Sequence, residues 1–340
     1  GMEIKEALSE IIKGQDLQRE DMSSVMLQIL EGRSTDAQIG AFLVALSIKG
    51  ESIDEVIGAV SVMRELSEKV GVDSQHLVDT CGTGGSGVGI FNVSTASAFI
   101  ACACGARVAK HGNRSVTSTS GSADLLEQAG LCLELSPKNV SRCIEEIGVG
   151  FMFAPAHHSA MKHAIGPRKE MGLKTIFNIL GPLTNPAGAL NQVIGVYDKK
   201  WLKPIAEVLR ELGSKHVLVV HSKDHLDEIS IADETYVAEL INGSIKEYVI
   251  RPEDFGFSKQ PLGDLIVFSP SESLSLVKQG LLDKNYAASS MIAMNAGAAL
   301  YVSGIANNLK KGVAQATECI KSGKGLEKLE ELVIFSQSLS

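Results

Sequence analysis

The hydrophobic positions of the first seventy residues recur every three to four residues, which is typical of amphipathic helices. Three of these runs end at Gly14, Gly32 and Gly50, and a fourth begins at Ser52, where Glu55 has the spacing of a capping box. The sequence therefore predicts a small all-helical unit. Its apolar faces are broad enough to bury a core or to contact a partner subunit.

From Leu77 onward, short apolar runs alternate with stretches of helical periodicity. This alternation is typical of an α/β fold with a mostly parallel sheet covered on both faces. Asn242-Gly243 between two alternating runs predicts a β-hairpin. Strands are expected near Val78 and at 107–110, 131–135, 149–153, 192–196, 216–220 and within 236–250. Helices are expected from Ser94, at 123–129, 140–147, 174–180, 202–212, 274–280, 286–302, 313–320 and 326–334, and after Pro155.

Glycines crowd the loop between the first of these strands and the helix that starts near Ser94. They are Gly82, Gly84, Gly85, Gly87 and Gly89. Glycine accepts positive φ and lets the backbone approach a ligand, and the helix N-terminus behind the loop presents free N–H groups. Such a place binds phosphate, although tight turns use the same residues. The loop fits neither the dinucleotide-binding pattern nor the P-loop.

Two further polar segments follow predicted strands. Lys110–Arg114 comes after the second strand, and we expect it to lie beside the glycine loop as part of a site for a large anion. Asp227 and Glu228 follow the apolar run HVLVVHS, which places two carboxylates at the end of a strand, where open α/β sheets build their sites. Oxygen ligands of this kind suit Mg²⁺ shared with substrate phosphates. A bare Asp-Glu pair is otherwise a common solvated loop.

Composition and charge exclude several classes of protein. With 340 residues, 44% of them hydrophobic, the chain can bury a large core, and no apolar run has the length of a membrane span. The acidic amphipathic start differs from a signal peptide, and the six cysteines form no CxxC pair, so we expect a cytoplasmic protein with reduced thiols. The net charge of −8 argues against a nucleic-acid partner. His157, His158 and His163 lack the partners of a zinc site.

Seven segments, in this order, resemble the anthranilate phosphoribosyltransferase family. They are GTGG from Gly82, NVST from Asn92, KHGNR from Lys110, GSADLLEQAG from Gly121, FAPAHHSAMKH from Phe153, RKEMGLKTIFNILGPLTNP from Arg168 and LDEIS from Leu226. The resemblance covers about residues 35 to 260. It implies transfer of the phosphoribosyl group of 5-phosphoribosyl-1-pyrophosphate (PRPP) to anthranilate, with Mg²⁺ as cofactor and release of pyrophosphate, in tryptophan biosynthesis.

The resemblance also implies which side chains bind each substrate. The residues that match the family's PRPP contacts are Gly82, Thr83, Gly84, Gly85, Asn92, Ser94, Thr95, Lys110 and Ser122. Those that match its anthranilate contacts are Gly82, His111, Asn113, His158, Arg168 and Gly181, and those that match its metal ligands are Ser94, Asp227 and Glu228. No residue is assigned as a general acid or base. Ser86 stands where the family usually has Asp, so the anion loop is less acidic here.

The resemblance further implies a nucleoside phosphorylase/phosphoribosyltransferase-like arrangement of two domains. Residues 1–72, joined by roughly 165–190, form the helical domain, and residues 73–164 with 191–340 form the α/β domain that binds PRPP. The chain then crosses twice between the domains, which makes a hinge with the active site between the halves. The family is usually dimeric through its helical domain, so a homodimer is expected.

Two other assignments stay open at this stage. The first is a pyrimidine-nucleoside phosphorylase of related fold, which phosphate-dependent nucleoside cleavage would identify and against which the RKEMG and LDEIS segments speak. The second is a catalytically silent paralogue that binds phosphorylated ligands or nucleic acid. A basic surface or the loss of Lys110 or Asp227 would favour it, and the sequence has neither.

Overall fold

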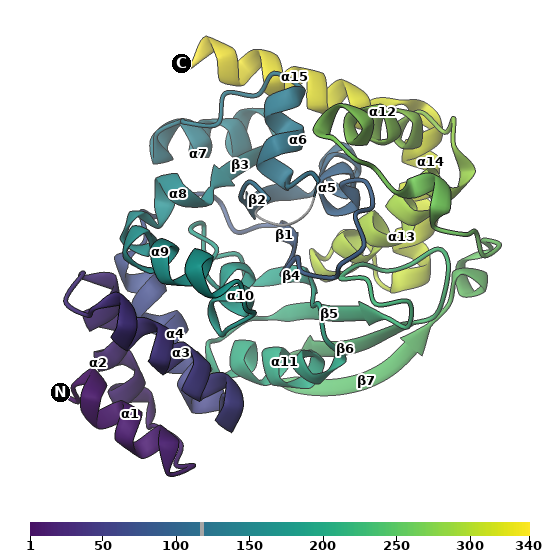
Figure 1. The fold of residues 1–340 in the computed structure, drawn as a ribbon. Helices are drawn as coiled ribbons and strands as arrows, with labels where there is room; N and C mark the ends of the chain where they lie inside the picture. The colour runs from purple at the N-terminus through teal and green to yellow at the C-terminus, as the bar shows by residue number, and fades with distance from the viewer. Residues whose placement is uncertain (116–118) are drawn as a thin grey trace.

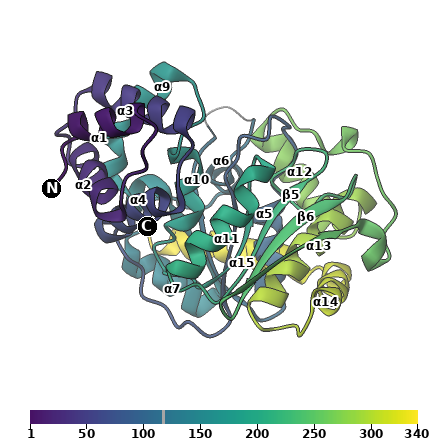
Figure 2. The same ribbon diagram turned by 90° about the horizontal axis from the view of Figure 1, so that it is seen from below.

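Four N-terminal helices form the predicted helical unit, and a fifth helix from the middle of the chain packs against it (Figure 1). The computed structural model describes residues 1–115 and 119–340. The fifth helix, α9, contacts α2 and α3, and both views show it beside them (Figure 2). The helices are α1 (Ile4–Ile12), α2 (Arg19–Leu30), α3 (Asp36–Lys49), α4 (Ile53–Leu66) and α9 (Lys162–Met171).

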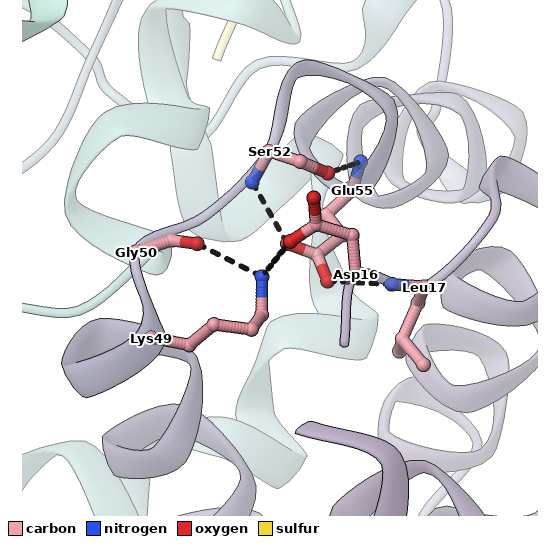
Figure 3. Close-up of polar contacts among 6 residues, drawn as sticks. All are labelled: Asp16, Leu17, Lys49, Gly50, Ser52 and Glu55. Atoms are coloured by element: carbon pink, nitrogen blue, oxygen red, sulfur yellow. Dashed lines mark hydrogen bonds and ion pairs between the residues drawn. The ribbon is translucent and has the colours of Figure 1, made fainter. Parts of the chain in front are cut away.

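A buried cluster of charges anchors the start of α4 (Figure 3). The Glu55 side chain is fully buried and accepts hydrogen bonds from the backbone N–H groups of Leu17 at 2.9 Å and Ser52 at 2.8 Å. The Lys49 ammonium lies 2.8 Å from Glu55 and 2.5 Å from Asp16. The capping box predicted at Ser52 is therefore present, and its glutamate also joins three segments of the helical unit. We call these residues the Lys49–Glu55 cluster.

The sheet has seven strands in the order β3-β2-β1-β4-β5-β6-β7. The first five pair in parallel and the last two are antiparallel, which confirms the mostly parallel sheet. Asn242 and Gly243 both have positive φ, at 49° and 81°, as the predicted hairpin requires. The strands are β1 (Leu77–Gly82), β2 (Arg107–Gly112), β3 (Val149–Phe153), β4 (Asn191–Gly195), β5 (His216–Ser222), β6 (Thr235–Ile241) and β7 (Ser244–Ile250).

Helices cover both faces of the sheet, which has two large buried cores and a smaller third one that includes Val140 and Ile144. α5 and α13 pack on one face, together with Leu218 and Val220 of β5. α11 packs on the other face with Val217 and Val219, and this second core continues without a break into α2, α3 and α4. The helices of this half are α5 (Val93–Ala103), α6 (Ser122–Gln128), α7 (Pro137–Ile147), α8 (Ala154–His157), α10 (Phe177–Leu180), α11 (Leu202–Glu211), α12 (Pro270–Leu281), α13 (Tyr286–Val302), α14 (Leu309–Ser322) and α15 (Lys324–Ser338).

The strand predicted at 131–135 is wrong. Leu131 and Leu133 are buried and Glu134 is exposed, so the alternation that suggested a strand is real. However, the segment joins no ladder; it packs against the helical layer, where the Cys132 N–H donates to Ser336 Oγ of α15 at 3.1 Å. A period of two reports only that one side of an extended segment is buried.

The helix predicted at 174–180 begins later, at Phe177. Side chains replace the first helical turn, because Asn178 Oδ1 accepts the Thr175 N–H at 2.8 Å and Thr175 Oγ1 accepts the Phe177 N–H at 3.3 Å. Threonine and asparagine often compete with helix formation in this way. Lys174 therefore lies outside α10. Among the described residues, no helix combines the length and the apolar character that crossing a membrane requires.

Candidate active site

Three polar segments meet at the carboxyl edge of the sheet. β1 and β2 pair in parallel, so the glycine loop after β1 and the segment from Lys110 lie side by side as predicted. Asp227 follows β5 and reaches the same place, where its Oδ2 accepts the Gly84 N–H at 3.0 Å. The edge therefore gathers the glycine loop, a lysine and the carboxylate pair.

A pair of glycines on neighbouring strands makes the floor under Asp227. Gly82 of β1 and Gly195 of β4 are register partners. A Cβ atom on Gly82 would lie 2.5 Å from Asp227 Oδ2, and one on Gly195 would lie 1.6 Å from the Asp227 backbone oxygen. No side chain fits at either position, so both glycines are required by close approach. Gly195 carries no motif signal of its own and was not predicted.

The two adjacent carboxylates lie deep in the molecule and keep part of their surface open. Burial raises the pKa of Asp227, and burial together with the neighbouring Asp227 raises the pKa of Glu228 well above its usual value. The backbone N–H of Ser94 partly offsets this effect on Glu228. Within the described ranges neither carboxylate forms an ion pair. The charge of Lys110 acts on both groups without forming an ion pair with either. Two adjacent carboxylates of this kind are a set of oxygen ligands that fits Mg²⁺.

The N-terminus of α5 presents uncapped donors to this edge. Asn92 is the N-cap residue, but its side chain makes no capping bond. Instead Asn92 Oδ1 accepts from the hydroxyl groups of Ser120 at 2.8 Å and Ser273 at 2.6 Å, which leaves the first N–H groups of the helix to other partners. The buried Thr95 Oγ1 also lacks a partner in the structure as described. Free N–H groups at a helix N-terminus favour an anion.

β2 carries two consecutive polar side chains that point to opposite faces of the sheet. Lys110 points toward α5, where its ammonium donates to the Thr80 carbonyl oxygen and to Ser94 Oγ at 3.4 Å. His111 points to the other face, and its ring centroid lies 5.1 Å from that of His158. Lys110, expected to contact PRPP, and His111, expected to contact anthranilate, are thereby on opposite faces of the strand.

The two histidines lie side by side on the face of the sheet where the anthranilate contacts are expected. Burial and the neighbouring His158 lower the pKa of His111 to about 3, and the backbone of Gly181 opposes this shift. Burial likewise lowers the pKa of His158 to about 4. Both rings are therefore neutral at pH 7, and their Nε2 atoms lack partners among the described residues. Two neutral rings whose Nε2 atoms have no partner suit contact with a flat polar ligand.

Arg168 and Asn113 are two further side chains expected to contact anthranilate. The Arg168 guanidinium stacks over the Phe177 ring at 5.5 Å, on the short helix that leads to Gly181, and burial lowers its pKa. It forms no ion pair within the described part of the chain. Asn113 is exposed after β2, and its Oδ1 accepts the Arg114 N–H at 2.7 Å. Ser122 lies against Gly112, where a Cβ atom would be 2.0 Å from its hydroxyl.

Asp79 of β1 is a buried carboxylate that no motif identified, and its hydrogen bonds join β1 to β2 and to Asn185. Asp79 Oδ1 accepts the His111 N–H at 3.3 Å, and its Oδ2 accepts from Asn185 Nδ2 at 2.8 Å. Asn185 also donates to the Ala109 carbonyl oxygen at 3.0 Å. These bonds replace the β1–β2 ladder, whose register ends at Val78. Polar groups at fixed positions in two strands and a loop cannot be matched from sequence spacing alone.

The remaining predicted residues have local roles in the structure. Ser86 Oγ accepts the Val88 N–H at 3.2 Å, which closes a small turn in the anion loop. His157 Nδ1 lies 2.8 Å from the Glu68 carbonyl oxygen, and the His163 ring lies over Gly32. The three neighbouring histidines therefore point in different directions, and in the described part of the chain no group of three or more His, Cys, Asp or Glu side chains is arranged to hold a metal.

Comparisons with known proteins agree with this geometry. Residues 5–67 match the helical bundle domain of a glycosyl transferase family, and residues 74–326 match the a/b domain of the same family. The anthranilate phosphoribosyltransferase of Cellvibrio japonicus is 57% identical over 99% of this chain and 100% of its own length. That of Saccharophagus degradans is also 57% identical, over 98% and 99%.

Solved structures show the same similarity. The anthranilate phosphoribosyltransferase from Thermus thermophilus is 40% identical and superposes with a TM-score of 0.92 over 97% of this chain and 99% of its own. The Saccharomyces cerevisiae enzyme in complex with PRPP and Mg is 26% identical, with a TM-score of 0.90 over 99% and 98%. The same yeast enzyme has been solved with 4-fluoroanthranilate.

Proposed function

Because the chain belongs to the anthranilate phosphoribosyltransferase family, we propose that it performs the family's reaction at the site described above. It transfers the phosphoribosyl group of PRPP to the amine of anthranilate and releases pyrophosphate, a step of tryptophan biosynthesis. One observation carries the assignment to this site: Lys110 and His111, adjacent on β2, point to opposite faces, one toward Ser94 at the start of α5 and the other toward the neutral ring of His158.

PRPP binds at the carboxyl edge between the glycine loop and the N-terminus of α5. The N-terminus of α5, which has no side-chain cap, and the Lys110 ammonium receive its phosphate groups. As the bond between C1 and the pyrophosphate oxygen breaks, negative charge grows on the leaving group, and each well-placed donor there contributes roughly 3 kcal/mol. The contacts we assign are Gly82, Thr83, Gly84, Gly85, Asn92, Ser94, Thr95, Lys110 and Ser122.

The carboxylate pair holds Mg²⁺ in this proposal. Asp227, Glu228 and the Ser94 hydroxyl supply protein oxygens, and the pyrophosphate and water supply the rest, as is usual for this cation. The unpaired carboxylates support the assignment, and the related yeast enzyme was solved with PRPP and Mg. Bound Mg²⁺ would neutralise charge on the departing pyrophosphate.

Anthranilate binds on the other face of β2. Its ring lies among His111, His158 and Gly181, and its carboxylate pairs with Arg168, whose guanidinium lacks an acidic partner within the described residues. Asn113 and Gly82 complete the contacts. The amine is a weak nucleophile that needs alignment more than a strong base, so no side chain is assigned as general base.

The assembly follows the same family. We propose that 1–72 with roughly 165–190 form one domain, that 73–164 and 191–340 form the other, and that they move about the two crossings. Packing of α9 on α2 and α3 supports this division. A cytoplasmic homodimer that associates through the helical domain completes the proposal.

The test is the loss of anthranilate fluorescence when PRPP and Mg²⁺ are added to the purified protein. Loss that requires both additions, with release of one pyrophosphate per anthranilate consumed, is the expected result. No fluorescence change, together with phosphate-dependent cleavage of pyrimidine nucleosides, would overturn the proposal in favour of a nucleoside phosphorylase. Binding of PRPP without turnover of any amine would indicate a silent paralogue.

A further inference from the structure

Lys174 crosses from the segment after α9 to the anion loop. Its ammonium donates a hydrogen bond to the Gly85 carbonyl oxygen and lies 4.4 Å from the centre of the Tyr197 ring. A Cβ atom on Gly85 would be 3.0 Å from Lys174 Cε, and Gly85 has a φ of +74°. The glycine therefore serves the turn of the loop and also the approach of this lysine. Lys174 is not among the residues expected to bind either substrate.

The anion loop is held from two sides by groups outside it. Asp227 accepts the Gly84 N–H at 3.0 Å, and Lys174 donates to the carbonyl oxygen of the next residue. Tyr197 supports the same loop, because its N–H donates to Thr83 Oγ1 at 3.0 Å. Two peptide groups of the loop are thus fixed from outside it, one by a carboxylate and the other by an ammonium. A glycine-rich loop loses much conformational entropy when it is ordered, so such fixation favours ligand binding.

An exposed lysine usually contributes little, because solvent screens its charge. Lys174 differs from such a residue in two ways. It forms no ion pair within the described residues, so its positive charge is not neutralised by an acid. It also bonds to the loop that faces the predicted pyrophosphate, and its remaining N–H groups are open to solvent. A cation above an aromatic ring keeps a defined position.

We propose that Lys174 is a positioning residue for PRPP, which holds the anion loop in its binding conformation and adds positive charge beside the pyrophosphate. It belongs to the segment that carries Arg168, so it also connects the anthranilate side of the molecule to the PRPP side. The inference rests on the proposed function. It predicts that loss of the ammonium weakens PRPP much more than anthranilate.

The test compares Lys174→Met with Lys169→Met. Methionine keeps most of the length of the side chain and removes the charge. Lys169 is an exposed lysine of the same segment that has no ion-pair partner among the described residues. Lys174→Met should raise the KM for PRPP by about tenfold, the scale of one charged hydrogen bond, with kcat and the KM for anthranilate within about twofold. Lys174→Arg should restore most of the affinity, because arginine can donate to the carbonyl and stack on the ring.

Calorimetry with magnesium pyrophosphate gives a readout that does not depend on turnover, and the Kd should rise for Lys174→Met alone. Equal KM values for the two methionine variants, or equal loss of PRPP and anthranilate affinity, would overturn the inference while leaving the proposed function intact. An unmodified protein without transferase activity would instead reject the proposed function. Unchanged unfolding midpoints of all variants exclude a general loss of structure.

Discussion

The Lys49–Glu55 cluster and the Asp227–Glu228 pair both place carboxylates deep in the protein, and they differ in how those carboxylates are satisfied. Glu55 has a lysine and two backbone N–H groups as partners. Asp227 and Glu228 have single backbone donors, a raised pKa and no ion pair in the described ranges. The cluster is complete without a ligand, whereas in the proposed function the pair is completed by a bound cation. Buried charge therefore indicates function where its partners are missing.

The largest effect is expected from breaking the complete cluster. Glu55→Ala would leave the Lys49 ammonium and two backbone N–H groups without their buried acceptor, which should lower the free energy of unfolding by about 3–5 kcal/mol. Urea denaturation measures it. Asp54→Asn, in the exposed ion pair with Arg19, is the matched control and should leave stability unchanged. A Glu55→Ala protein that is as stable as the control would show that the cluster is not structural.

The incomplete pair should respond in the opposite way. Asp227→Asn can still accept the Gly84 N–H but loses the charge, so turnover should fall by about a hundredfold or more, roughly 3 kcal/mol, without loss of stability. Glu228→Gln should behave alike, and chelation of divalent metal should reproduce the loss in the unmodified protein. Full activity in EDTA, or in either variant, would reject the metal assignment.

The same comparison can be made at the proposed anthranilate site, where Arg168 forms no ion pair within the described residues. Arg168→Ala should raise the KM for anthranilate by about one to two orders of magnitude, the scale of a lost charge-assisted hydrogen bond. The KM for PRPP should change much less, because that substrate binds on the other face of β2. Steady-state constants for both substrates decide the question. Equal weakening of both, or no change in either, would mean that Arg168 does not bind the carboxylate.

The smallest expected effect is a dependence of the free energy of unfolding on pH. His111 and His158 have pKa values of about 3 and 4 in the folded protein, below the ordinary value of 6.5. The unfolded chain therefore takes up protons first as the pH falls, and stability that is present above pH 6.5 is lost progressively toward pH 4. Each histidine should cost about 1 kcal/mol at one pH unit below 6.5. His158→Gln should flatten this dependence in urea titrations, and an unchanged slope would contradict it.

Most of the site could be predicted because parallel strands bring their carboxyl ends to one edge. Given the strands, the glycine loop, Lys110 and Asp227 had to meet there. Gly195 and Asp79 could not be predicted in the same way, because their importance arises from register partners and loops that are distant in sequence.

The fold shows the same limit. Alternation at Leu131 and Leu133 identified a buried side correctly but not the helix that buries it. Likewise, the periodicity around Phe177 predicted a helix, but side-chain hydrogen bonds at Thr175 delay its start. Lys174 therefore lies before the helix and bonds to the anion loop. Local pattern identifies which side of a segment is buried, and tertiary contacts determine whether it becomes an element and where that element begins.

The opposite orientation of Lys110 and His111 on β2 has a stereochemical consequence. In the proposed roles, pyrophosphate leaves toward the face that Lys110 occupies, and the amine of anthranilate arrives from the face of His111. A nucleophile and a leaving group on opposite sides of one carbon exchange in a single displacement, without a covalent intermediate on the enzyme. With these roles we expect the configuration at C1 of the ribose to be inverted in every turnover.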